Sequence, residues 1–357
     1  MSETQDTQPA EAKSVLLTGA NGYVGAWIAR RLLEEGHRVH ATVRDANDPR
    51  KTAHLEAMAA ELPGTLRLFS ADLTSPNAFD EAMQGCGTVI HSAARFTTSS
   101  NDPMQDYVIP AIEGTKNVLA SVGRTETVNR VVMTSSCAAI YGDAADVADA
   151  PGGILTEEVW NTTSNTDHQP YSYSKTASER AAWQIAKAQN RWRLVTINPS
   201  LVIGPALSDK PDSGSFQYLH NFINGTLRTG APALFVGMVD VRDVADAHVR
   251  AAFLPDAEGR YILSEGSYSL MDTAKILSRH FKNHSLPPFE IPSPLARLIA
   301  PLMSQLITRR FARRNFGHVW KADNSKSRGD LGIDYRPVEA ALVEMFAQMT
   351  GETPVKG

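Results

Sequence analysis

Several features that define other protein classes are scarce or missing from this 357-residue sequence. It contains only two cysteines, Cys86 and Cys137, too few for a disulfide framework or a four-cysteine zinc site, so we expect a reducing, cytoplasmic location. No run of about 18 apolar residues is present, so we expect no membrane-spanning helix. Residues 1–12 form a polar tail without the apolar core of a signal peptide.

Neither sign of charge dominates the chain. The 35 Lys and Arg residues against 39 Asp and Glu residues give a formal net charge of −4, with both signs spread along the sequence. We therefore expect no nucleic-acid partner. The spacing of histidines, cysteines and carboxylates suggests no metal site. The hydrophobic fraction of 42% is that of a folded globular protein.

Up to about residue 198, short apolar runs alternate with longer stretches of helical spacing. Runs typical of buried strands occur at residues 14–17, 37–43, 66–69, 88–91, 130–134 and 193–197. Helical spacing occurs at residues 23–35, 104–122 and 170–188. This alternation predicts an α/β fold with a doubly wound, Rossmann-type parallel sheet. Right-handed crossovers then place the carboxyl ends of the strands, and a ligand crevice, along one edge.

A glycine-rich turn, Thr18-Gly19-Ala20-Asn21-Gly22-Tyr23-Val24-Gly25, follows the first strand and opens the first helix. Gly19 permits the tight turn, Gly22 lets backbone N–H groups approach a pyrophosphate, and Gly25 lets helix and strand pack closely. The helix N-terminus adds free donors and partial positive charge. A tight turn without a ligand is the alternative. The position at the start of a βαβ unit predicts dinucleotide binding, with contacts from Gly19, Gly22, Tyr23, Val24 and Gly25.

The alternation breaks after residue 198, in a loop rich in proline and glycine. A helix is predicted at residues 216–227, and a strand and helix at 234–240 and 241–253 should return to the sheet. The sequence after residue 253 predicts a smaller, mostly helical substrate-binding part, with weak strand signals near Tyr261 and Phe289. The expected division is a dinucleotide-binding domain at 13–200 and 234–254, a substrate-binding part at 201–233 and 255–351, and tails at 1–12 and 352–357.

The end of the second strand discriminates between the nicotinamide cofactors. An NAD site places Asp or Glu there for the ribose 2′-hydroxyl, whereas this sequence has Val43-Arg44, with Lys51 close behind. A guanidinium can bind a 2′-phosphate bidentately, so the sequence predicts NADPH or NADP over NADH. The alternatives are that Arg44 is a solvated surface residue, or that Asp45 neutralises it.

Asp72 and Leu73 follow the third strand and are predicted to contact the cofactor. In the expected sheet order, Asp72 would face the adenine amino group. The alternative is that Asp72 serves as a turn or helix N-cap aspartate.

Tyr171 and Lys175 lie four residues apart near the start of a predicted helix, so they share one helix face. A phenol protonates an alkoxide near neutral pH only when its own anion is stabilised, and a fixed ammonium nearby does this. Ser136 follows the fifth strand, at the same expected edge as the glycine turn. Its hydroxyl could bind a substrate carbonyl oxygen together with the phenol. The three side chains predict an active site; an exposed amphipathic helix face is the alternative for the tyrosine–lysine pair alone.

These motifs resemble the extended short-chain dehydrogenase/reductase family. They are most similar to the branch with dihydroflavonol 4-reductase, cinnamoyl-CoA reductase and microbial aldehyde or ketone reductases. The resemblance covers residues from about 13 to 351. Further matching segments are residues 89–94, 114–119, 198–205, 239–245 and 324–328.

The resemblance implies a role for each matching residue. Tyr171 would be the proton donor, Lys175 would hold the nicotinamide ribose, and Ser136 would orient the carbonyl, with Ser135 as the alternative serine. For the cofactor, the resemblance implies that the 2′-phosphate is bound by Arg44 and Lys51, and that the nicotinamide end is lined by Ala93, Pro199 and Val202.

The leading hypothesis is an NADPH-dependent reductase that converts a medium-sized, apolar or aromatic aldehyde or ketone to the alcohol. Residues 169–175 differ from the Asn-Trp-Tyr-Cys-Tyr-Gly-Lys run of cinnamoyl-CoA reductases, and Tyr141 replaces a polar residue of dihydroflavonol reductases. A CoA thioester and a flavonoid are therefore disfavoured. The alternatives are a nucleotide-sugar epimerase or dehydratase, or a steroid-type dehydrogenase. We expect a small-molecule carbonyl substrate and a monomer or homodimer.

The apolar segment 295–307 precedes Arg309, Arg310, Arg313 and Arg314 at helical spacing. We expect a helix packed in the core with a solvated basic end. A membrane-surface helix or a docking site for an anionic substrate tail are the alternatives.

Overall fold

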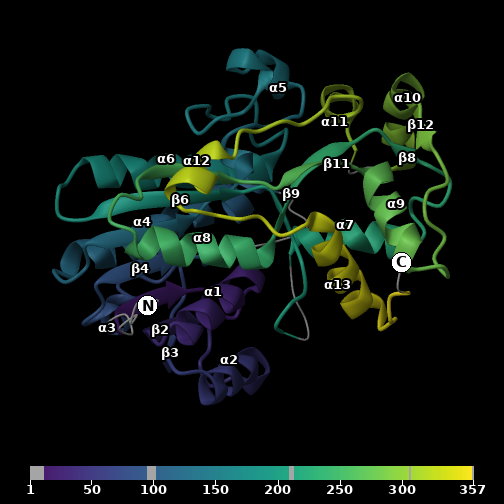
Figure 1. Cartoon of the computed structure of the whole chain (residues 1–357). Coiled ribbons are helices and arrows are strands. Elements are labelled where there is room, and N and C mark those ends of the chain that lie inside the picture. The colour runs from purple at the N-terminus through teal and green to yellow at the C-terminus, as the bar shows by residue number, and fades with distance from the viewer. Residues whose placement is uncertain (1–11, 95–101, 209–212, 305–306, 356–357) are drawn as a thin grey trace, which may run out of the picture.

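Seven parallel strands form the centre of the computed structural model (Figure 1). The structure describes residues 12–94, 102–208, 213–304 and 307–355, so nearly all of the predicted N-terminal tail lies outside it. The strand order is β10-β6-β5-β4-β1-β2-β3, and all neighbours are parallel. The strands are β1 (Ser14–Thr18), β2 (Arg38–Val43), β3 (Thr65–Ser70), β4 (Thr88–His91), β5 (Arg130–Thr134), β6 (Arg193–Pro199) and β10 (Gly259–Leu263). The predicted doubly wound sheet is confirmed, and its order reverses between β1 and β4.

Helices cover both faces of this sheet because alternate strand residues point to opposite sides. In β1, Val15 and Leu17 belong to the apolar core on one face, whereas Leu16 belongs to the core on the other. The first core is completed by α1 (Tyr23–Glu34), α2 (Pro49–Glu61) and α8 (Val241–Phe253). The second core is completed by α3 (Asp80–Met83), α4 (Ile109–Arg124), which continues from η1 (Met104–Val108), and α6 (Pro170–Lys187).

Strand β9 (Phe235–Asp240) does not return to the main sheet as predicted. It lies in a three-stranded sheet between β7 (Leu201–Ile203) and β11 (Gly266–Ser269). The chain leaves β6 at Pro199 and passes almost directly into β7, which pairs with β9. The open edge of β6 is taken by β10 instead. That prediction was therefore wrong for β9, although α8, which follows it, does pack on the main sheet.

The remaining elements gather mainly at one end of the molecule, on the right of Figure 1. A third core joins the small sheet to α7 (Gly214–Ile223), α9 (Leu270–His280) and α13 (Val338–Thr350). Short elements complete this part of the chain: β8 (Ala231–Pro232), β12 (Glu290–Ile291), α10 (Ser293–Met303) and α11 (Arg309–Asn315). Helix α12 (Ser325–Asp330) lies instead beside β10 of the main sheet. The segment after β5 holds η2 (Cys137–Ala139), α5 (Asp146–Asp149) and η3 (Pro151–Gly153). The exact division into domains stays a prediction.

Helix α10 is not packed in the core as expected. Among its residues only Ala296 is buried, whereas Leu298 and Leu302 are 68% and 75% exposed. The reason is that α10 meets the protein through a small cluster of Ala296, Ala312 and Phe316, which leaves its larger side chains outside.

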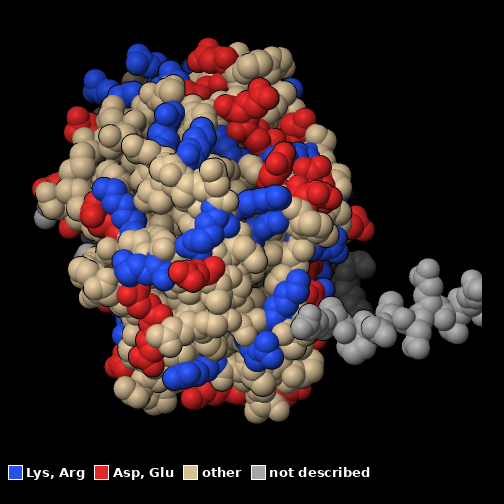
Figure 2. Space-filling model, turned by 90° about the vertical axis from the view of Figure 1, so that its left-hand side faces the viewer, with Lys and Arg blue, Asp and Glu red and all other residues tan. Residues whose placement is uncertain are grey.

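The surface agrees with the mixed charge of the sequence. On the face shown in Figure 2, acidic and basic side chains are interspersed among uncharged ones. None of the helices within the described ranges combines the length and apolar character that a membrane span needs.

Candidate active site

A cavity of about 1790 Å³ runs along the carboxyl ends of the main-sheet strands. Every residue predicted for the site lines it: Gly19, Gly22, Tyr23, Val24, Gly25, Arg44, Lys51, Asp72, Leu73, Ala93, Ser136, Tyr171, Lys175, Pro199 and Val202. The structure thus brings these side chains to one place. Their individual roles stay predictions.

The glycine turn is tight for steric reasons. Gly19 has φ +70°, and a Cβ there would lie 2.6 Å from Cα of Ala93. A Cβ on Gly25 would lie 2.1 Å from the carbonyl oxygen of Gly19, so only glycine lets α1 approach β1 this closely. Gly22 is the N-cap of α1 and has no side chain to accept from the first amides of the helix. The turn therefore fits a pyrophosphate, which would accept those bonds.

The side chain of Tyr23 is engaged within the protein. Its hydroxyl donates to the carbonyl oxygen of Gly204 at 2.7 Å. Burial and the carboxylate of Asp240 raise the pKa of Tyr23 well above its usual value. Tyr23 thus links α1 to the loop after β7, and its buried ring forms part of the cavity wall.

Cationic side chains line the cavity where β2 ends. Arg44 is exposed and has no carboxylate partner among the residues that the structure describes. Asp45, also within the described residues, forms no ion pair with Arg44, and its carboxylate accepts from the backbone N–H of Asn47 at 2.9 Å. A carboxylate that the sequence analysis missed, Asp48, lies 3.7 Å from Nζ of Lys51. Asp48 caps α2 as well, so Lys51 is partly neutralised and Arg44 is the stronger candidate for a phosphate.

The side chains at the ends of β3 and β4 are fixed by local hydrogen bonds. Asp72 accepts from the backbone N–H of Thr74 at 2.8 Å, the turn role considered as an alternative, and it also lines the cavity. Asn117 of α4 donates to the carbonyl of Leu73 at 2.7 Å. The N–H of Ala93 donates to the Thr18 hydroxyl at 3.1 Å, which holds the chain after β4 close to the glycine turn.

The two serines after β5 differ in their partners. Ser135 is buried and donates its hydroxyl to the carboxylate of Glu179. Ser136 accepts from the backbone N–H of Ala138 at 3.1 Å and lines the cavity. That bond uses a lone pair of Ser136 and leaves its O–H free to donate. Ser136 can therefore bind a ligand without giving up an existing hydrogen bond.

Glu179, which the sequence analysis did not identify, is a fully buried carboxylate behind the site. It accepts from Arg260 Nε at 2.7 Å and from Asn198 Nδ2 at 2.8 Å. Asn198 also donates to the carbonyl oxygen of Ser136 at 3.1 Å. Glu179 therefore ties α6 to β6 and β10 and to the segment that carries Ser136. The sequence signal was its position four residues after Lys175, on the same helix face.

Tyr171 and Lys175 lie on the first turns of α6. The Nζ of Lys175 is 5.9 Å from the centre of the Tyr171 ring, and both side chains line the cavity. Tyr171 is 42% exposed, so its phenol faces open space rather than the core. Burial, with a contribution from Lys175, lowers the pKa of the nearby His91 to about 4, which keeps His91 neutral.

The cavity wall beyond Tyr171 has a different character. It includes the large apolar or aromatic residues Tyr141, Tyr218, Leu234, Phe235 and Phe311. Apart from Lys175, the charged residues of the described lining are all near the glycine turn and the ends of β2 and β3. The cavity is thus divided into a polar, cationic end and an end that suits an uncharged, apolar ligand.

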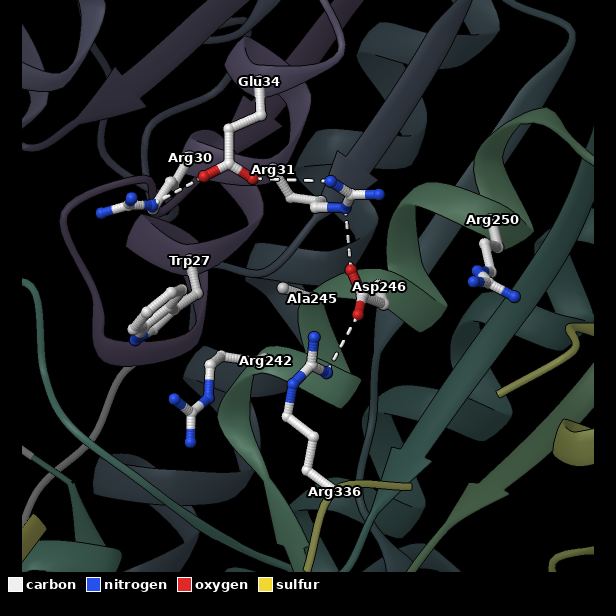
Figure 3. A pocket seen from close by; sticks show the side chains of 9 residues that line it. All are labelled: Trp27, Arg30, Arg31, Glu34, Arg242, Ala245, Asp246, Arg250 and Arg336. Carbon is white, nitrogen blue, oxygen red and sulfur yellow. Dashed lines mark hydrogen bonds and ion pairs between the residues drawn. The ribbon is translucent and has the colours of Figure 1, made fainter. Parts of the chain in front are cut away.

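A second cavity of about 490 Å³ lies between α1 and α8, outside the predicted site (Figure 3). It is lined by Trp27, Arg30, Arg31, Glu34, Arg242, Ala245, Asp246, Arg250 and Arg336. Its arginines are all engaged: Arg31 with Asp246 at 2.8 Å, for example, and Arg250 with the carbonyl of Gly332 at 2.7 Å. This is an ion-pair network that joins α1, α8 and the segment before α13.

Comparison with known proteins agrees with this geometry. The profile of the NAD dependent epimerase/dehydratase family matches residues 15–262, which hold the glycine turn, Ser136 and the tyrosine–lysine pair. The chain belongs to this family. The resemblance to extended short-chain dehydrogenases/reductases found in the sequence is thereby confirmed.

Several relatives of the chain are named as reductases. The chain is 35% identical to cinnamoyl-CoA reductase CAD2 of Medicago truncatula, over 92% of this chain and 93% of that protein. It is 32% identical to an anthocyanidin reductase of Vitis vinifera, over 78% of this chain and 84% of that protein. The crystal structure of Gre2 from Candida albicans in complex with NADPH has a TM-score of 0.74 and 26% identity, covering 95% of this chain and 99% of that one. The family member described here is thus an NAD(P)-dependent reductase of the branch that holds these proteins.

Proposed function

We propose that this family member uses NADPH to reduce a medium-sized, apolar or aromatic aldehyde or ketone to the alcohol. The lining of the cavity carries the proposal: it combines cationic residues such as Arg44 after β2, aromatic residues such as Phe235 and Phe311, and Tyr171. Relatives support it, since the yeast methylglyoxal/isovaleraldehyde reductase Gre2 complexed with NADPH has a similar structure, at TM-score 0.73 and 26% identity, covering 95% of this chain and 98% of that one.

The described residues fit such a cofactor. The glycine turn offers close backbone approach to a diphosphate, and Arg44 stands free for a 2′-phosphate. The buried hydroxyl of Ser200, next to Pro199 in the cavity wall, has no hydrogen-bond partner among the described residues. A ligand that brought a polar group to this wall would satisfy it.

The residues of the chain divide the work around the carbonyl. Bound NADPH would supply a hydride for the carbonyl carbon. The Tyr171 phenol would donate the proton to the oxygen, and Ser136, free to donate, would hold that oxygen in place. The ammonium of Lys175 would stabilise the phenolate left behind.

The apolar end argues against two of the other substrates considered, a CoA thioester and a nucleotide sugar. A CoA thioester or a nucleotide sugar carries several phosphate charges and needs cations in the substrate end. Among the described lining residues beyond Tyr171 there is no arginine, and Lys175 is the only lysine.

The test is NADPH oxidation over a panel of aldehydes and ketones, with the variant Tyr171→Phe. Loss of the proton donor should lower kcat by about 100-fold or more, while NADPH still binds. Tyr173→Phe is the matched control, because Tyr173 does not line the described cavity wall. Turnover by Tyr171→Phe equal to that of the control would contradict the assignment, and NAD retained tightly by the purified protein would favour an epimerase.

A further inference from the structure

One side of helix α10 presents a row of large apolar side chains to solvent. Leu298, Leu302 and Met303 are 68%, 75% and 73% exposed, and Leu295 is 48% exposed. The spacing of Leu295, Leu298 and Leu302 places them on one side of the helix. Scattered exposed leucines are ordinary in proteins, but a contiguous exposed row on one helix marks an interaction surface.

The chain around this row contains no carboxylate. Between Glu290 and Asp323 the sequence has neither Asp nor Glu, while it has Arg297, Arg309 and Arg310, followed by Arg313, Arg314 and Lys321. A stretch of this length without acidic residues contrasts with the mixed charges of the rest of the chain.

The arginines of α11 that are free for a partner are exposed. Arg314 is engaged with Asp143 and Asp146, whereas Arg309, Arg310 and Arg313 have no carboxylate within ion-pair distance in the part of the chain that the structure describes. Within the described ranges, Arg310 donates to the carbonyl of Thr163, at 3.2 Å. These three guanidinium groups therefore remain available for an anion.

Helices α10 and α11 are neighbours (Figure 1). They are held together by a small apolar cluster of Ala296, Ala312 and Phe316. We call the exposed side chains Leu295, Leu298, Leu302, Met303, Arg309, Arg310 and Arg313 the α10–α11 patch. The patch thus joins an apolar row to a cluster of unpaired cations.

We propose that the α10–α11 patch binds the surface of an anionic lipid bilayer. Leucine side chains on one helix side enter the boundary between headgroups and acyl chains, and neighbouring arginines bind lipid phosphates. A second copy of the chain fits less well, because a two-fold contact of the patch with itself would bring two clusters of unpaired arginines into one interface, and the patch has no carboxylate to pair with them. The proposal does not depend on the proposed function.

The position of the patch relates it to the catalytic cavity. Phe311 and Asn315 belong to α11, the helix that carries the arginines, and both line the cavity. A bilayer bound at the patch would therefore lie near the apolar end of the cavity.

The experiment is co-sedimentation of the full chain with vesicles of phosphatidylcholine alone, and of equal parts phosphatidylcholine and phosphatidylglycerol. We expect binding to the anionic vesicles only, and weaker binding at high salt. The pair Arg309→Glu and Arg313→Glu should lower the partition coefficient by about 25-fold or more, at about fivefold for each arginine charge lost. The pair Leu298→Ser and Leu302→Ser should lower it on the same vesicles without changing charge.

Matched controls separate the patch from general effects. Arg67→Glu with Lys187→Glu makes the same charge change on β3 and α6, and Leu254→Ser with Val355→Ser removes exposed apolar side chains elsewhere. Thermal unfolding checks that each variant is folded. Equal sedimentation of patch and control variants, or none by the unaltered protein, would overturn the proposal. The proposal would also be overturned if the unaltered protein were a dimer and the variant with Leu298→Ser and Leu302→Ser a monomer, because the patch would then be a contact between copies.

Discussion

Replacing Glu179 by Ala should destabilise the protein more than almost any other single change in the site. The Glu179 carboxylate is fully buried and accepts hydrogen bonds from Ser135, Trp183, Thr196, Asn198 and Arg260. Its removal leaves the Arg260 guanidinium, itself only 7% exposed, without a counter-charge. Three backbone carbonyls and the Trp160 ring at 3.9 Å remain around that guanidinium.

The magnitude follows from the loss of one partner of a buried ion pair. Such a change lowers the free energy of unfolding by about 3–5 kcal/mol. With an unfolding entropy of about 2.1 cal/mol/K per residue over 357 residues, this corresponds to a Tm lower by about 4–7 °C. Glu179→Gln keeps the volume and one acceptor, so its loss should be smaller.

Thermal and urea unfolding of the full chain measure this effect. Glu113→Ala is the matched control, since Glu113 is 52% exposed on α4 and pairs with Lys116 at 2.9 Å. That change should stay within about 0.5 kcal/mol of the unaltered protein. If Glu179→Ala and Glu113→Ala unfolded at the same temperature, the stabilising role of the buried network would be refuted.

Three further predictions concern the cofactor end and acid stability. Gly25→Ala should weaken NADPH binding more than tenfold in a fluorescence titration, because its Cβ would lie 2.1 Å from the Gly19 carbonyl; Gly123→Ala, with open space around it, should not. Arg44→Ala should raise the KM for NADPH by about tenfold or more and leave the KM for NADH unchanged. Equal increases in both KM values would contradict the role of Arg44 in binding the 2′-phosphate. Burial lowers the pKa of His248 to about 4, so as the pH falls the unfolded chain takes up a proton before the folded chain does. The free energy of unfolding should therefore fall by up to about 3 kcal/mol as the pH drops from about 6.5 to about 4. His248→Gln should flatten this slope in urea titrations at each pH, and an unchanged slope would exclude His248 as its source.

The central sheet could be predicted because its strands are buried on both faces. Val15, Leu16 and Leu17 are all fully buried, and such a short apolar run between turn residues is typical of a central parallel strand. Helix α2 was not predicted, because only its Thr52 and Leu55 are buried and its apolar periodicity is weak. The pattern of β9 identified a strand but not its partner, because pairing depends on where β7 lies.

The site was predictable where its chemistry needs a fixed local spacing. The glycines of the turn and the four-residue step from Tyr171 to Lys175 are set by one turn and one helix, so the sequence shows them directly. The ion pair of Glu179 with Arg260 joins residues far apart in the chain, and no local pattern specifies it. The exposure of Leu302 depends likewise on tertiary packing. The apolar sequence of residues 295–307 does not show whether the helix faces the core or the solvent.

The direct passage from β6 into β7 has a mechanical consequence. Pro199 ends the main sheet, Val202 lies in the small sheet, and Ser200 between them is bonded through its N–H to the Leu263 carbonyl at 2.9 Å. Both Pro199 and Val202 line the cavity, so its two walls are joined by a covalent bridge of a few bonds. A change in the angle between the small sheet and the large one would therefore bend the chain at this junction and alter the width of the cavity between its two walls.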